Sequence, residues 1–117
     1  MRGLWPPLIN EEPIMEKFIA KSMKEDLIIE VKILNGDTVM LEPSIDYSAE
    51  GIVGLMRQWT KIEEAQTEDT QKLQIIASQL AIVYVNEPNW WLLNLDPGTL
   101  IEILNHVART IGGLKKN

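Results

Sequence analysis

The sequence predicts a mainly α-helical fold with a small β-hairpin, an α+β arrangement. Apolar and polar side chains alternate over residues 27–42, which is the period of half-buried strands. Farther along, apolar side chains recur three or four residues apart in about three segments, the period of amphipathic helices. We expect an N-terminal arm with a possible short helix over residues 1–26, one hairpin-plus-helices domain over residues 27–114, and a basic tail over residues 115–117.

The composition restricts the classes of function. With 117 residues, 45% of them apolar, the chain is long enough for one domain with its own core. A net charge of −6 argues against a nucleic-acid partner, since phosphate binding needs concentrated Lys and Arg. No apolar run approaches the ~18 residues of a membrane helix, so we expect no membrane partner. The absence of cysteine excludes disulfides and thiolate metal sites and fits a cytoplasmic protein.

The N-terminal arm is rich in proline, which favours an extended chain. Trp5 gives the arm an aromatic side chain that could dock on a partner. After the last of these prolines, residues 14–24 could form a short helix with Ile14, Phe18 and Ile19 on one side.

The first regular element is the hairpin around Asn35-Gly36. A two-residue loop would pair Val31 with Met40 and mix the two faces, whereas a three-residue loop pairs Val31 with Val39. We favour the three-residue loop, a type I turn with Gly36 in the left-handed region, and keep the two-residue turn as the alternative.

The first long helix should begin after Asp46 or Ser48, either of which can cap it. Its apolar side then contains Ile52, Leu55, Met56, Trp59 and Ile62. A polar break over residues 63–70 follows. Thr67 is the expected N-cap of the second helix, with Glu68 and Asp69 in its first turn.

The second helix should run to about Asn86, because the residue before Pro88 is disfavoured in helical geometry. Residues 86–97 are then expected to form a connector. Asp96 as N-cap, Pro97 at the first helical position and Gly112-Gly113 as the stop define the third helix. Its apolar stripe is Leu100, Ile103, Leu104, Val107 and Ile111.

The candidate partner-binding residues are Ile75, Ile82, Trp90, Trp91 and Trp5. Ile75 and Ile82 lie nearly opposite the core stripe of the second helix, so they either make that helix central in the fold or face another chain. Trp90 and Trp91 are adjacent and cannot both point the same way. One should fill the core, and the other should cover it or anchor a partner. Trp59, Leu80 and Leu104 should be core residues.

The chain contains no pattern typical of an enzyme. Its single histidine, His106, excludes a multi-histidine metal site, and Glu102 and Arg109 beside it are typical of a charged, solvated helix face. The glycines lack the lysine and strand of a phosphate-binding loop. We therefore expect no catalytic residues, no metal and no cofactor.

One family has a similar order of elements. The hairpin sequence Lys32-Ile33-Leu34-Asn35-Gly36, and a leucine-rich, acidic segment leading into a final helix at residues 92–113, resemble tail assembly chaperones of long-tailed bacteriophages. The resemblance covers about residues 27–114.

The resemblance implies a small helical protein in the cytoplasm of the bacterial host. It would coat the tape measure protein, keep it soluble and help to recruit tail tube subunits, and it could be a homo-oligomer. An apolar groove would suit the long amphipathic helix of a tape measure. The alternative is an acidic immunity or inhibitor-type protein that binds a toxin or enzyme.

Overall fold

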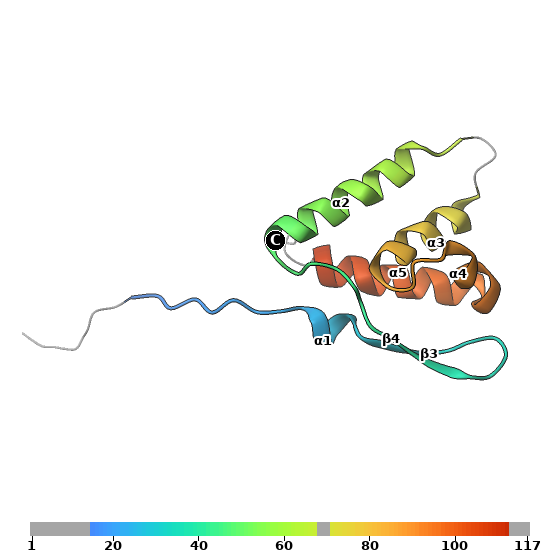
Figure 1. Ribbon diagram of the computed structural model, residues 1–117, viewed down its shortest axis with the longest axis horizontal. Coiled ribbons are helices and arrows are strands. Elements are labelled where there is room, and N and C mark those ends of the chain that lie inside the picture. The colour runs from blue at the N-terminus through green and yellow to red at the C-terminus, as the bar shows by residue number, and fades with distance from the viewer. Residues whose placement is uncertain (1–14, 68–70, 113–117) are drawn as a thin grey trace, which may run out of the picture.

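The computed structural model describes residues 15–67 and 71–112. Helices hold 58% of the described residues, and two short strands form one antiparallel hairpin, so the mainly α fold with a small hairpin is confirmed. Figure 1 shows the elements in chain order. They are α1 (Lys24–Leu27), β3 (Ile29–Lys32), β4 (Thr38–Leu41), α2 (Ala49–Glu64), α3 (Lys72–Val83), α4 (Pro88–Asn94) and α5 (Pro97–Gly112).

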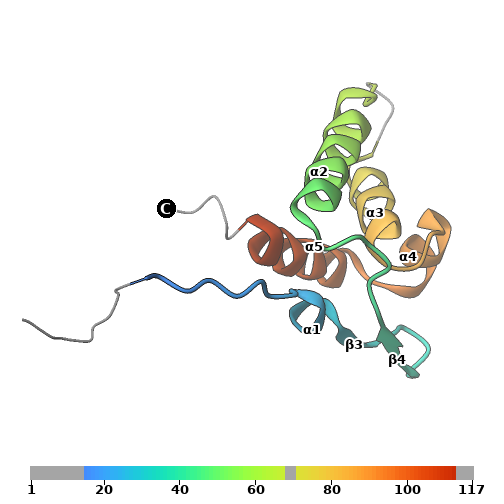
Figure 2. The same cartoon turned by 60° about the vertical axis from the view of Figure 1, so that its left-hand side comes forward.

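Helix α3 is the centre of the fold. It contacts α2, α4 and α5, which are arranged around it, while the hairpin and α1 lie on the far side of α5 from α2 (Figures 1 and 2). Its composition explains this position, because apolar residues surround most of its circumference. Its buried side chains are Ile76, Ala77, Gln79, Leu80, Ala81 and Val83.

The hairpin has the expected register. Val31 pairs with Val39, and Ile29 pairs with Leu41. The Gly36 amide donates to the Ile33 carbonyl at 2.9 Å, and Gly36 adopts a φ of 99°, which glycine tolerates without a steric penalty. The three-residue loop is confirmed. It fits because it puts Val31 and Leu41 together on the buried face.

Helix α2 begins after a double cap. The Ser48 hydroxyl accepts a hydrogen bond from the Gly51 amide at 3.0 Å, and the Asp46 carboxylate accepts one from the Ser48 amide at 2.9 Å. Hydrogen bonds from Ser48 lower the pKa of Asp46 below its usual value. Both residues proposed as caps therefore act at this end.

The start of α3 differs from the prediction. Gln71, not Thr67, is the N-cap, and it forms a reciprocal capping box with Gln74. Glu68 and Asp69 lie outside the described residues. The predicted start was wrong because acidic first-turn residues stabilise a helix only weakly, whereas helices in proteins depend mainly on packing. Leu73 is the first residue of α3 that packs on the core.

The region expected to be a connector contains an additional helix, α4. Helix α3 ends at Val83, earlier than expected, and Glu87 is extended at φ −147° and ψ 96°, as a residue before proline should be. Pro88 then occupies the first turn of α4, where its missing amide costs nothing. The seven residues of α4 are stabilised by Trp91, whose side chain is completely buried and whose indole donates to the Val85 carbonyl at 3.0 Å.

Helix α5 begins as expected. The Asp96 carboxylate accepts hydrogen bonds from the Thr99 hydroxyl at 2.6 Å and from the Thr99 amide at 3.2 Å, and these bonds lower the pKa of Asp96. Pro97 is the first helical residue. In the apolar stripe, Leu104 is only half-buried, unlike Leu100, Ile103, Val107 and Ile111. Gly113 and the tail at residues 115–117 lie outside the described residues.

The short helix expected over residues 14–24 does not form in the described part of that range. Residues 15–23 are not helical, and regular structure begins with α1 at Lys24. Phe18 is 87% exposed and Ile19 72%, so these side chains of the expected apolar side do not pack on the described core. Helix α1 itself is anchored, since Leu27 is fully buried and the His106 ring Nε2 donates to the Asp26 carbonyl at 2.7 Å.

Two glycines in α2 provide a matched test of its N-terminal packing. A methyl group on Gly51 would collide with the backbone oxygen and side chain of Asp46, whereas one on Gly54 would meet nothing. Gly51→Ala should therefore lower the free energy of unfolding by at least about 1 kcal/mol through overpacking. Gly54→Ala should raise it by about 0.5–1 kcal/mol through helix propensity. Urea unfolding measures both, and equal effects would show that Asp46 does not pack against α2.

Tyr84 joins the end of α1 to the end of α3. Its hydroxyl donates to the Leu27 carbonyl at 2.5 Å, and its ring lies 5.8 Å from that of Trp91. Burial, with a smaller contribution from Tyr47, raises the pKa of Tyr84 from 10.0 to about 12. Within the described residues, the buried hydroxyl of nearby Tyr47 has no hydrogen-bond partner.

We predict opposite outcomes for removing these two hydroxyls. Tyr84→Phe should lower the free energy of unfolding by about 1 kcal/mol at pH 7, because a buried hydrogen bond is lost. Tyr47→Phe should be neutral or stabilising, because a buried hydroxyl without a partner is removed.

The raised pKa of Tyr84 predicts how the stability of the fold changes at high pH. Because the pKa of Tyr84 is raised, its contribution to stability is complete below pH 10 and is lost as the pH rises from 10 toward 12. Chemical denaturation at pH 8, 10 and 11 should show a shallower decline for Tyr84→Phe than for wild type. Parallel declines would contradict this assignment.

Candidate functional site

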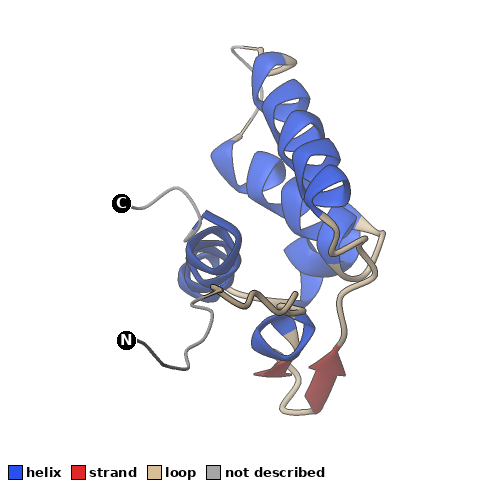
Figure 3. Cartoon of the chain, turned by 90° about the vertical axis from the view of Figure 1, so that its left-hand side faces the viewer, coloured by secondary structure: helices blue, strands red, loops and turns tan. Residues whose placement is uncertain are grey.

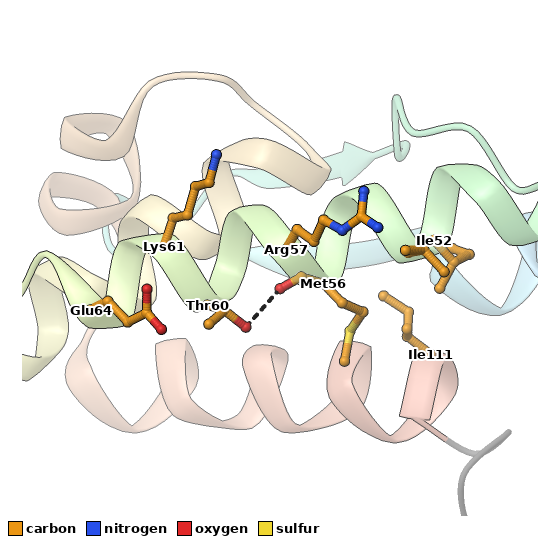
Figure 4. Close-up of a pocket in the computed structure, with 8 residues that line it drawn as sticks. Ile52, Met56, Arg57, Thr60, Lys61, Glu64 and Ile111 are labelled. Atoms are coloured by element: carbon orange, nitrogen blue, oxygen red, sulfur yellow. Dashed lines mark hydrogen bonds between the residues drawn. The ribbon is translucent and has the colours of Figure 1, made fainter.

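The principal candidate site is an apolar groove along α2 that reaches across to the end of α5, with a volume of about 560 Å³. Figure 4 shows Met56 and Ile111 between the two helices, while Arg57 and Lys61 project from the other side of α2. We call this surface the α2–α5 groove. It is lined by Ile52, Val53, Met56, Arg57, Thr60, Lys61 and Glu64 of α2 and by Ile111 of α5.

The groove exists because α2 has more apolar surface than α3 can cover. Ile52, Leu55 and Trp59 are buried, and the Trp59 indole donates to the Gln79 carbonyl at 3.0 Å. Val53, the residue after Ile52, is 48% exposed. The Thr60 hydroxyl donates to the Met56 carbonyl at 3.0 Å, so it needs no partner from outside. What remains is an apolar floor with charges at its border.

The hollow continues along the face between α2 and α5. A neighbouring depression shares Met56 and Ile111 with the groove and extends to Leu104. A third depression shares Leu104 and reaches Ile75 and Ile101. The Gln79 side chain, almost completely buried, donates to the Glu63 carboxylate at 3.1 Å between them. The groove along α2 is therefore apolar, and the depression beyond Glu63 is more polar.

The structure separates the candidate residues named from the sequence. Ile75 is half-buried and lines the third depression, while Ile82 is half-buried and packs on the core. The two isoleucines therefore do not form one exposed face. Trp5 lies outside the described residues.

The two adjacent tryptophans have different environments. Trp91 has no exposed surface, which removes it from the partner-binding candidates. Trp90 is half-buried and packs edge-on against Trp91, with ring centroids 5.2 Å apart. One tryptophan thus fills the core, as expected, and the other packs against it with part of its side chain still exposed.

A second exposed apolar surface lies at the tip of the hairpin. The Leu34 amide donates to the Asn94 carbonyl at 2.9 Å, which places the tip against the end of α4. Leu93 of α4 is 75% exposed, and Leu34 in the hairpin loop is also exposed. Neither this surface nor the exposed Val53 was predicted from the sequence. Exposed leucines in the connector and hairpin were the available signal, but only the fold shows which apolar side chains remain uncovered.

The described residues hold few groups suited to catalysis. No cluster of three or more His, Asp and Glu in this part of the chain could hold a metal ion. His106, expected on a solvated face, is instead half-buried and bonded to the Asp26 carbonyl. Among the helices described, none is both long and apolar enough to cross a membrane.

Comparison with known proteins does not add a family to this picture. No protein-family model, curated protein or solved structure matches the chain. The candidate site therefore rests on the geometry of the α2–α5 groove and of the surfaces around it.

The different positions of Ile75 and Ile82 predict different costs of substitution. Ile82→Glu places a carboxylate against the core and should lower the free energy of unfolding by about 2 kcal/mol or more. Ile75→Glu borders a polar hollow and should cost less than about 1 kcal/mol. Urea unfolding followed by tryptophan fluorescence would compare them. If Ile82→Glu unfolded at the same urea concentration as wild type, Ile82 would belong to an outward-facing surface.

Proposed function

We propose that the protein is a non-enzymatic assembly chaperone that binds an amphipathic helix of a protein partner in the α2–α5 groove. The observation that carries the proposal is the groove itself, an apolar surface on α2 bordered by charges of both signs. Such a surface suits helix-in-groove recognition, in which an apolar stripe docks and the flanking polar residues meet the rim.

The dimensions of the groove support a helical occupant. Its α2 residues extend from Ile52 to Glu64, which at 1.5 Å per residue is roughly 18 Å, about three helical turns. A partner helix with apolar residues three and four positions apart would cover Val53 and Met56 over this length. Arg57, Lys61 and Glu64 would then face the polar sides of that helix.

The resemblance to phage tail assembly chaperones suggests the partner. A tape measure protein is a long helix with apolar stripes, and such a chaperone would keep it soluble in the cytoplasm of the bacterial host and help to recruit tail tube subunits. The net charge of −6 would keep the resulting complex soluble.

The alternative, an acidic inhibitor of a toxin or enzyme, is less well supported. Such a protein would gather its carboxylates into one binding patch. The best-formed groove instead carries Arg57 and Lys61 beside Glu64.

Two apolar-to-acidic substitutions test the proposal, one in the groove and one outside it. Val53→Glu and Leu93→Glu each add one charge at an exposed position, so both variants should fold. Co-expressed with the tape measure protein of the same phage, wild type and Leu93→Glu should hold it in the soluble fraction. Val53→Glu should weaken binding at least tenfold, about 1.4 kcal/mol, as measured by calorimetry with a tape measure helix.

The other outcomes are equally informative. Loss of binding only in Leu93→Glu would move the site to the hairpin tip and α4. If wild type does not bind the tape measure but forms a stoichiometric complex with a toxin or nuclease, the inhibitor function would replace the chaperone function.

A further inference from the structure

The segment that precedes α1, residues 15–23, exposes an unusual amount of apolar surface. Met15 is 78% exposed, Phe18 87% and Ile19 72%. Large apolar side chains concentrated in one segment, without cover, are typical of surfaces that bind another protein. We call this stretch the 15–23 segment.

The sequence of this segment has the period of a helix that the isolated chain does not form. Met15, Phe18 and Ile19 stand at positions i, i+3 and i+4, while Glu16, Lys17 and Lys21 fall on the other sides. A nine-residue helix is unstable in water unless its apolar side packs on something. The segment therefore has the pattern of a helix but lacks a surface to fold against.

The groove of the same molecule is poorly placed to supply that surface. In Figures 1 and 2, α5 lies between α2 and α1, the helix from which the segment leaves, and the segment extends beyond the end of the helices; in Figure 3, α5 is seen end-on, to the left of α2. Helix α1 is held in place by buried Leu27 and by the His106–Asp26 hydrogen bond. To reach its own groove, the segment would have to reverse its direction and pass the C-terminal end of α5.

We infer that the 15–23 segment of one copy folds as a helix in the α2–α5 groove of a second copy. Each copy carries one uncovered segment and one uncovered groove, so two copies can cover both in a symmetric, closed exchange. Phe18 and Ile19 then cover Val53 and Met56. This inference rests on the proposed function in one respect: the partner helix and the 15–23 segment bind the same groove.

The lengths of the two surfaces agree, and Glu16 gives the segment one carboxylate for the basic border of the groove. Nine helical residues span about 13 Å, which is within the roughly 18 Å of the groove along α2. Glu16 lies beside the apolar side of the segment and can face Arg57 or Lys61 on the groove's border. Charge pairs at such borders fix orientation more than they add affinity.

The consequence is a competition at the groove. A partner helix must displace the segment of the neighbouring copy, so the protein without its partner is self-associated and keeps both apolar surfaces covered. Binding of the partner then separates the two copies or opens one groove of the pair. The apparent affinity for the partner falls by the fraction of grooves already occupied.

A complementation experiment tests the exchange directly with full-length protein. Phe18→Ser with Ile19→Ser disables the segment and leaves the groove, while Val53→Glu disables the groove and leaves the segment. By sedimentation velocity, wild type should be a dimer and each variant should self-associate at least tenfold more weakly. A mixture of the two variants should form a heterodimer, because one working segment meets one working groove.

Charge reversal tests the orientation. Glu16→Lys should weaken the dimer, and combining it with Lys61→Glu and Arg57→Glu should restore it. Leu93→Glu is the matched control, since it adds a charge outside both surfaces and should leave the dimer unchanged.

Several results would overturn the inference. If the wild-type protein is a monomer, the inference is wrong. If limited proteolysis also fails to cut at Phe18 in that monomer, the segment docks within its own chain. A mixture of the two variants that stays monomeric would also overturn the inference. Failure of the proposed function is separate: the Phe18→Ser, Ile19→Ser variant has an open groove, and if it does not bind a tape measure helix, the chaperone proposal fails whatever the dimer does.

Discussion

The architecture depends on the burial of α3. This helix has apolar residues around most of its circumference. Helices α2, α4 and α5 pack together because each covers part of α3. The same constraint explains the groove. A helix of twelve residues has too little surface to cover both α5 and the longer α2, so one side of α2, including Val53, remains partly exposed. The candidate binding surface is thus a result of how the core is built.

The elements that could be predicted from the sequence are those fixed by local rules. The hairpin register follows from requiring Val31 and Val39 to share a face, and the start of α5 follows from Asp96 and Pro97. These depend on steric and hydrogen-bonding preferences within a few residues, which a single sequence displays completely. The same is true of Trp59, whose place in the α2 stripe predicts its burial.

The elements that were missed depend on partners distant in the sequence. Helix α4 is too short for a clear helical period and is held by Trp91, which inserts beside Tyr84. The opposite error occurred before α1, where a helical period was present but the apolar side chains Phe18 and Ile19 are exposed and the helix does not form. The candidate site was located only in part for the same reason. Ile75 and Ile82 were chosen from a helical projection, and a projection does not show that α3 is enclosed by three other helices.

The hydrogen bonds made by Gln79 have a consequence for how the groove responds to an occupant. Its backbone carbonyl accepts from the Trp59 indole, and its side-chain amide donates to Glu63 one turn farther along α2. Apolar contacts alone would allow α2 to slide lengthwise on α3 at little cost in free energy, because such contacts have no preferred direction. Two directional bonds at different heights allow only one axial position. The wall of the groove is therefore held rigid before anything binds, and an incoming helix spends little of its binding free energy on ordering it.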